Sequence, residues 1–346
     1  MSARVFRAFD HLERLSDARG LFEHAKGADR REEQGYCTDD NARLLVVASR
    51  EADLPLADRL GRLALAFIVE SQAPDGSCRN RMDRDGRWTD QPSTEDCWGR
   101  SVWGLGAAAA GHTDPLVRAA SLDAFDRGIA QRSRWSRAMA FAALGAADVV
   151  ATHPEHQAAR DLLIDALDVI VGEGRGGSGV PRPMTPDWNW PEARLRYANA
   201  ALAEAVIAAG AALDRPADLA QGLAMLAWLL DLQTSHGHLS LVGVEGRGPK
   251  NQGPQFDQQP IEAAAMAEAC WRAHAATGDS SWLAGVDAAA RWFEGDNDTG
   301  AAMYDRVGGG GYDGLERHGV NINQGAESTL ALASTMQRSL QMAETR

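Results

Sequence analysis

Hydrophobic residues recur with a helical period along almost the whole chain. Alanine and leucine repeat at spacings of three and four residues in twelve segments, which is the pattern of amphipathic helices. The alternation of valine and isoleucine that is typical of strands is nearly absent. The hydrophobic pattern therefore predicts an all-α protein.

The twelve segments alternate between two kinds. The first kind has a charged face, typical of helices that are wet on one side, and is expected as outer helices at residues 3–15, 55–72, 115–131, 156–172, 216–233 and 280–295. The second kind is rich in small apolar residues on most sides, typical of closely packed helices, and is expected as inner helices at residues 40–51, 95–111, 135–151, 193–213, 260–276 and 324–340.

The connections alternate as well. Short turns with proline or aspartate helix-start signals follow the first five inner segments, whereas long loops precede most of them, at residues 16–38, 73–94, 173–192, 234–259 and 296–323. Six inner and six outer helices with this alternation predict an (α/α)6 barrel, as one domain over residues 1–346. An α-solenoid is the alternative, but its repeats should be more uniform. The long loops and the inner-helix N-termini then surround one end of the barrel, and recurrent loops of this length are usually functional.

Composition narrows the class of partner. Lysine and arginine number 35 against 48 aspartates and glutamates, which gives a net charge of −13. Such a chain repels phosphate backbones and anionic lipids, so we expect neither nucleic acid nor a membrane as partner. The N-terminus has no signal-peptide stretch, and a cytoplasmic location is expected. The four cysteines form no CxxC pair, which favours free, buried or site-lining thiols over disulfides or zinc.

Polar clusters stand at the expected starts of the first two inner helices. Thr38 or Asp39 can cap the first helix, but a second acid, Asp40, and Arg43 exceed what a cap requires. At the second start, Ser93 and Asp96 fit a capping box. Glu95 and Asp96 are also followed within two turns by Trp98, Arg100 and Trp103. A role of the two acids in a functional site is therefore as well supported as a role in capping.

The later inner helices begin with residues suited to a sugar. Aromatic faces stack on the apolar faces of pyranose rings, while carboxylates and amides bind hydroxyl groups. The fourth, fifth and sixth starts supply Asp187, Trp188, Trp190 and Tyr197; Asp257, Gln258 and Glu262; and Asn321, Gln324 and Glu327. The third start has arginines and no acid, and we expect it to face solvent rather than to form a basic wall.

Three of these motifs resemble a bacterial family of six-hairpin-glycosidase-like (α/α)6 proteins, which occur alone or joined to glycosyltransferases. The motifs are Gly35–Arg43, Thr94–Arg100 and Asn323–Thr329. The resemblance covers most of the chain. It implies an (α/α)6 barrel, a carbohydrate substrate and a glycosyltransferase as a pathway partner, and it assigns no catalytic pair.

The residues favour a glycoside hydrolase that acts on an oligosaccharide or exopolysaccharide fragment, with no metal or cofactor. Such enzymes need one protonated carboxyl group and one carboxylate. We expect Asp40 and Asp96 as the principal pair, with Asp257 and Glu327 as rivals. The expected substrate-binding residues are Tyr36, Asp39, Arg43, Glu95, Trp98, Arg100, Asp187, Trp188, Trp190, Tyr197, Gln258, Glu262, Asn321 and Gln324.

Two other functions fit the same residues. A sugar epimerase or isomerase, or a polysaccharide lyase, would use histidine, tyrosine or arginine at the barrel centre, and the absence of histidine from the inner-helix starts argues against it. A non-catalytic carbohydrate-binding protein that serves a glycosyltransferase would need only the tryptophans and amides, with the acids as acceptors for hydroxyl groups.

Overall fold

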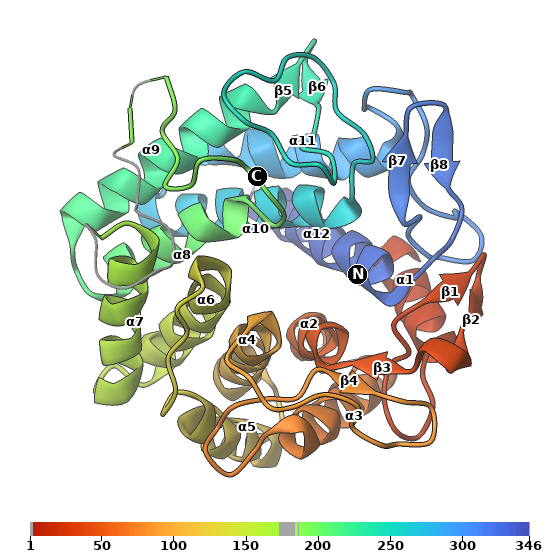
Figure 1. The fold of residues 1–346 in the computed structure, drawn as a ribbon, viewed down its shortest axis with the longest axis vertical. Coiled ribbons are helices and arrows are strands. Elements are labelled where there is room, and N and C mark those ends of the chain that lie inside the picture. Colours follow the sequence, from red (N-terminus) through yellow and green to blue (C-terminus); the bar gives the residue numbers. More distant parts are fainter. Residues whose placement is uncertain (1–2, 173–183, 186, 346) are drawn as a thin grey trace.

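The computed structural model describes residues 3–172, 184, 185 and 187–345. In these residues twelve α-helices form two concentric rings (Figure 1). The inner ring consists of α2 (Thr38–Ser49), α4 (Asp96–Gly111), α6 (Ser136–Thr152), α8 (Ala200–Ala212), α10 (Pro260–Thr277) and α12 (Ala326–Thr345). Each inner helix contacts the next one, and α12 contacts α2, so the ring is closed.

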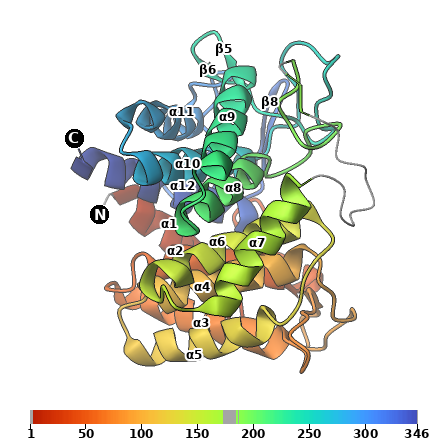
Figure 2. The same cartoon turned by 90° about the vertical axis from the view of Figure 1, so that its left-hand side faces the viewer.

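The outer ring consists of α1 (Ala3–Arg14), α3 (Pro55–Ser71), α5 (Pro115–Gly128), α7 (Gln157–Ile170), α9 (Pro216–Leu232) and α11 (Leu283–Glu294). Five of them pack against the inner helix that precedes them in the chain, and α1 packs against α12. The first outer helix therefore completes the hairpin of the last inner one. Figure 2, a side view, shows α7 and α9 on the outside of the barrel. The predicted (α/α)6 architecture is confirmed.

Small residues let the inner helices touch through their backbones. A Cβ atom on Gly106 of α4 would lie 2.3 Å from the carbonyl oxygen of Gly145 in α6, and one on Gly145 would lie 2.3 Å from the carbonyl oxygen of Val102. Because real Cβ atoms do not approach so closely, larger residues here would push the two helices apart. The glycines and alanines of the inner segments thus set the width of the barrel.

The long connections before the inner helices hold four short antiparallel strand pairs. These are β1 (Ala25–Lys26) with β2 (Asp29–Arg30), β3 (Tyr36–Cys37) with β4 (Arg81–Met82), β5 (Thr234–Ser235) with β6 (His238–Leu239), and β7 (Gly314–Glu316) with β8 (Gly319–Asn321). Two 3-10 helices, Glu32–Gln34 and Ser280–Trp282, complete the regular structure of the described residues. The pairing of β3 with β4 ties together the loops that precede α2 and α4.

Neither of the two helix caps that the sequence allowed is formed. The first turn of α2 is capped by Asn80 from the next loop, whose Oδ1 accepts hydrogen bonds from the backbone N–H groups of Thr38 at 3.1 Å and Asp39 at 3.3 Å. At α4 no side chain caps the helix, and the backbone N–H group from which Ser93 Oγ accepts is that of Glu95, at 3.3 Å, before the helix begins. A loop distant in sequence therefore supplies the cap that the local pattern assigned to its own residues.

Helix α8 begins at Ala200, seven residues later than its pattern predicts. The preceding residues are held by tertiary contacts instead: Leu195 exchanges backbone hydrogen bonds with Arg247. The carboxylate of Glu262 accepts from the N–H groups of Ala198 and Asn199. Ala198 has a positive φ of 45°, which is unfavourable for alanine, so the bonds to Glu262 fix a strained turn at the barrel mouth.

Candidate active site

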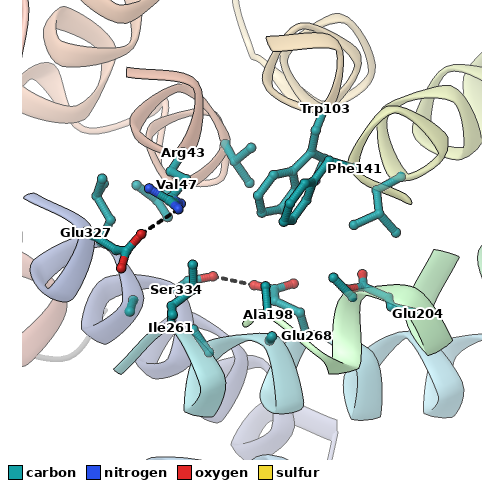
Figure 3. A pocket seen from close by; sticks show the side chains of 17 residues that line it. Arg43, Val47, Trp103, Phe141, Ala198, Glu204, Ile261, Glu268, Glu327 and Ser334 are labelled. Atoms are coloured by element: carbon teal, nitrogen blue, oxygen red, sulfur yellow. Dashed lines mark hydrogen bonds and ion pairs between the residues drawn. The ribbon is translucent and has the colours of Figure 1, made fainter. Parts of the chain in front are cut away.

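A cavity lies in the centre of the barrel and is lined by residues of all six inner helices (Figure 3). Its empty space is about 550 Å³, which includes the open mouth. Most lining side chains are apolar, and the charged ones are Arg43, Glu204, Glu268 and Glu327. An apolar cavity with a few polar groups is the usual form of a small-molecule site.

Trp103 of α4 and Phe141 of α6 form an aromatic wall on one side of this cavity (Figure 3). Their ring centroids are 5.7 Å apart and the ring planes differ by 23°. The guanidinium carbon of Arg100 lies 4.6 Å from the centroid of the Phe141 ring. Figure 3 shows the wall facing Glu268 and Glu204 across the cavity. A ring wall of this kind can pack against the apolar face of a sugar.

Arg43 of α2 connects two acids at the mouth. Its Nη1 donates to Asp40 Oδ1 at 2.5 Å and its Nη2 to Glu327 Oε2 at 2.6 Å. The Asp40 side chain is 3% exposed, whereas that of Glu327 is 39% exposed. Burial raises the pKa of Asp40, and the charge of Arg43 opposes that rise. Glu327 is therefore the acid of this group that a substrate can reach, and Asp40 holds Arg43 in place.

A second chain of polar contacts crosses from α2 to α4 and on to the loop before α8. Asp39 Oδ1 lies 3.0 Å from Arg100 Nη1, and Asp96 Oδ2 lies 3.5 Å from Arg100 Nη2. The hydroxyl group of Tyr197 donates to Asp96 Oδ2 at 2.7 Å. Burial and the charge of Asp96 raise the pKa of Tyr197, so the phenol keeps its proton. The structure thus brings these four predicted residues together at the mouth.

The third inner-helix start faces solvent only in part: Arg134 and Trp135 are exposed, as expected, whereas Arg137 is not. Arg137 of α6 is buried, donates to Glu192 at 2.7 Å and to the carbonyl oxygen of Tyr197 at 2.6 Å, and covers the Tyr197 ring at 4.8 Å. Nearby, Glu262 is buried beneath the turn at Ala198, and burial raises its pKa to about 7. Glu262 therefore supports the loop that presents Tyr197.

Asp257 precedes α10 and packs against the hairpin of β7 and β8. A Cβ atom on Gly314 would lie 2.1 Å from Asp257 Oδ1, so only glycine fits there. That oxygen is buried and has no hydrogen-bond partner in the described residues. Burial raises the pKa of Asp257 to about 6, and the charges of Glu316 and Asp313 add to the rise.

Asp313 links this region to the start of α12. It accepts hydrogen bonds from Ser328 Oγ at 2.7 Å and from the N–H of Gly325 at 2.8 Å. Burial raises its pKa, and the negative charge of Glu327 contributes to the rise. Because α10 and α12 are neighbours in the inner ring, Asp257, Asp313 and Glu327 form one acidic region of the mouth.

The three tryptophans predicted as sugar platforms belong to the core instead. Trp98 is fully buried and its indole N–H donates to the carbonyl oxygen of Gly128 at 2.9 Å. Trp188 donates to the carbonyl oxygen of Glu192 at 2.7 Å. Trp190 is fully buried, and its ring stacks on that of Trp228 with centroids 6.0 Å apart.

Other predicted binding residues also have structural partners. The Tyr36 hydroxyl group donates to Asp17 at 2.8 Å, with its ring stacked on Phe22. Gln258 is buried and bonded to Asp298 at 2.6 Å. Gln324 is buried against Gly310, where a Cβ would lie 2.1 Å from its Oε1. Of the rest, Glu95 and Asp187 are exposed, and Asn321 lies in β8 with its side chain bonded to the N–H of Asn323 at 3.2 Å.

Sequence reasoning missed Phe141, Glu204 and Glu268 and gave Trp103 no role. The acids were detectable, because Glu204 is the single charge of its alanine-rich helix and Glu268 stands among small apolar residues in another, and a buried charge needs a partner or a function. The ring of Phe141 had no such signal, since an aromatic residue on a buried helix usually packs in the core.

The cysteines are free and buried. In the described residues one group could supply three metal ligands within 4.8 Å of one another, Glu23, Cys37 and Asp40. Cys37 donates its proton to Asp40 at 3.1 Å, and burial raises the pKa of the thiol. A metal would need the thiolate, so these residues do not fit one. No helix in the described part of the chain has both the length and the apolar character to cross a membrane.

No protein-family model and no curated protein matches the sequence. Solved structures do match the fold. A D-mannose isomerase has a TM-score of 0.69 at 12% identity, over 99% of this chain and 97% of that one. A sugar epimerase from a ruminal bacterium has a TM-score of 0.67 at 11% identity, over 96% and 98%. A GH76 α-mannanase of Bacteroides thetaiotaomicron has a TM-score of 0.65 at 12% identity, over 99% and 96%. The chain thus shares the fold of six-hairpin (α/α)6 proteins.

Proposed function

We propose that the protein is a glycoside hydrolase that acts on an oligosaccharide or exopolysaccharide fragment. One observation carries the proposal: Glu327, an accessible carboxylate paired with Arg43, lines the same cavity as the aromatic wall of Trp103 and Phe141. The wall would hold a sugar ring, and the carboxylate would act on it. The fold neighbours named above include a mannanase and two enzymes that rearrange sugars, which supports a carbohydrate substrate.

In this mechanism Glu327 is the carboxylate that activates water or attacks the anomeric carbon. Its ion pair with Arg43 holds it in place at the cavity. The proton for the leaving oxygen comes from Asp257, whose pKa is raised to about 6. About half of this group is therefore protonated at pH 6 and about a tenth at pH 7, and a raised pKa of this kind is what a general acid requires. Of the other two candidates, Asp96 assists substrate binding through Tyr197, and Asp40 positions Arg43.

The test is product formation. Purified protein is incubated with α- and β-linked manno-, gluco- and galacto-oligosaccharides, and reducing ends are quantified over time. We expect release from at least one substrate and a loss of about 10²–10⁴-fold in rate for Glu327→Gln. Glu155→Gln is the control, because Glu155 is exposed in the turn between α6 and α7 and should leave the rate unchanged. Hydrolysis that survives in Glu327→Gln would exclude this mechanism.

A sugar epimerase or isomerase is the second candidate, favoured by a central cavity in which Glu327 could take a proton from a carbon beside a carbonyl group. No histidine is among the residues that line the cavity in the described part of the chain. The same incubation in D₂O separates the two functions. An epimerase or isomerase would place deuterium on a carbon of the sugar without releasing reducing ends, whereas a hydrolase would release them and leave carbon-bound hydrogen in place.

A further inference from the structure

The inner end of the cavity rests on a network of buried ion pairs. Glu268 accepts from Arg50 at 2.6 and 3.0 Å, from Arg338 at 2.8 Å, and from Ser334. Glu268 lies seven residues beyond Ile261 on α10, which corresponds to about 10 Å along the helix. Arg50 directly follows α2 and Arg338 lies in α12, so Glu268 of α10 is bonded to residues from two other parts of the inner ring.

Glu204 lines the same inner end but differs from Glu268. Its closest charged contact is Arg272, with 3.5 Å between Glu204 Oε1 and Arg272 Nε. Arg272 itself donates to Asp148 at 3.1 Å. The Glu204 side chain is 4% exposed, and within the described residues it accepts no hydrogen bond. Figure 3 shows its carboxyl group at the cavity, across from the aromatic wall.

A buried carboxyl group with unused hydrogen-bonding capacity is unusual, because buried polar groups are nearly always bonded. Burial also raises the pKa of Glu204, so a neutral donor would suit it. The surroundings are electrically balanced: Glu204, Glu268 and Asp148 face the three guanidinium groups of Arg50, Arg272 and Arg338. An ammonium group would be repelled by the arginines and a second carboxylate by the acids, whereas a hydroxyl group meets neither penalty.

We propose that Glu204 is a substrate-binding residue that accepts a hydrogen bond from a hydroxyl group of a neutral sugar unit at the inner end of the cavity. This inference deepens the proposed function and rests on its carbohydrate substrate.

The test is a binding measurement that needs no turnover. D-mannose, D-glucose and D-galactose are titrated into the wild type, Glu204→Leu and Glu70→Leu, with heat as the readout. We expect at least one sugar to bind and Glu204→Leu to weaken the binding of that sugar by about 10- to 100-fold, since a hydrogen bond to a buried carboxyl group is lost. Glu70→Leu is the matched control, because Glu70 is exposed on α3 and does not line the cavity, and this variant should bind within about twofold of the wild type.

If the sugar binds and no substrate is hydrolysed, the hydrolase proposal is refuted and the role of Glu204 in binding stands. Failure of the proposed function can therefore be told apart from failure of this inference. Unchanged affinity in a folded Glu204→Leu variant, or no binding of any of the three sugars to the wild type, would overturn the inference. Should Glu204→Leu fail to fold, monodeoxy derivatives of the sugar that binds are titrated into the wild type. One deoxy position should then lose about tenfold or more in affinity, and equal affinity for all of them would overturn the inference as well.

Discussion

Arg43 and Glu327 are 284 positions apart in the chain, yet the guanidinium group of Arg43 donates to Glu327 at 2.6 Å. The pair joins the second turn of α2 to the first turn of α12, the first and last helices of the inner ring. Closure of the barrel therefore creates the contact that places this carboxylate at the cavity. The other arm of Arg43 binds the buried Asp40, so the position of Glu327 depends on a residue that no substrate touches.

Replacing Arg43 should destabilise the protein through Asp40. The variant Arg43→Met leaves Asp40 buried without its cation, and breaking a buried pair in this way costs about 3–5 kcal/mol. Urea unfolding at pH 7 measures the loss. The double variant Asp40→Asn, Arg43→Met should recover about half of it or more, because the amide carries no charge. A double variant as unstable as Arg43→Met would show that Asp40 is not the cause.

The raised pKa of Asp257, about 6, predicts the alkaline limb of the pH profile. If Asp257 donates the proton, kcat/KM falls as pH rises through about 6, and Asp257→Asn is inactive. The negative charge of Glu316 helps to raise this pKa, so Glu316→Gln should move the limb to lower pH. If kcat/KM of Glu316→Gln falls at the same pH as that of the wild type, a group other than Asp257 donates the proton.

The same shift predicts a pH dependence of stability. The folded pKa of Asp257 lies above the value near 4 of an unfolded aspartate, so the folded state holds the proton more tightly. Stability from this group is present at low pH and is lost as pH rises from about 4 to about 6. The melting temperature of the wild type should therefore fall over that range relative to Asp257→Asn, and parallel curves would contradict the assignment.

Truncation of Trp103 should weaken sugar binding, whereas truncation of Trp98 should lower the stability of the fold. Trp103 lines the cavity, so Trp103→Ala should weaken sugar binding by about tenfold through loss of stacking. Trp98 is buried in the core away from the cavity, and Trp98→Ala should instead cost about 3–5 kcal/mol of stability. Calorimetric titration with the sugar that binds, together with urea unfolding of both variants, tests the contrast. If Trp103→Ala binds the sugar as tightly as the wild type does, the aromatic wall is not part of the binding site.

Glu262 should act through the loop that it supports. Glu262→Ala leaves the N–H groups of Ala198 and Asn199 without their acceptor, and we expect a loss of about 3 kcal/mol in the free energy of unfolding. Substrate affinity should weaken as well, because Tyr197 precedes the freed turn. Glu70→Ala, at an exposed position of α3, is the control and should change stability by less than about 0.5 kcal/mol. A Glu262→Ala variant as stable as this control would refute the supporting role.

The sequence alone determined the architecture, since hydrophobic period reports helices and side-chain size separates inner from outer ones. Glycine and alanine in segments such as that of Gly106 and Gly145 predicted close packing, and their backbones do touch. The polar helix starts also predicted which end of the barrel holds Asp39, Asp96, Arg100 and Tyr197, because parallel inner helices must present their N-termini together.

Only the tertiary structure decided which of these polar residues face the cavity. The sequence around a tryptophan in a polar loop does not show whether its ring stacks on a sugar or on another side chain. The ring of Trp190 stacks on that of Trp228. Likewise Asp40 and Glu327 both stand at helix starts, yet one is buried under Arg43 and the other is accessible. Rotation of each helix about its axis and the loop packed over it set that exposure. Both arise from contacts between residues far apart in the chain, such as Asn80 with Thr38 and Glu262 with Ala198, which a local pattern does not contain.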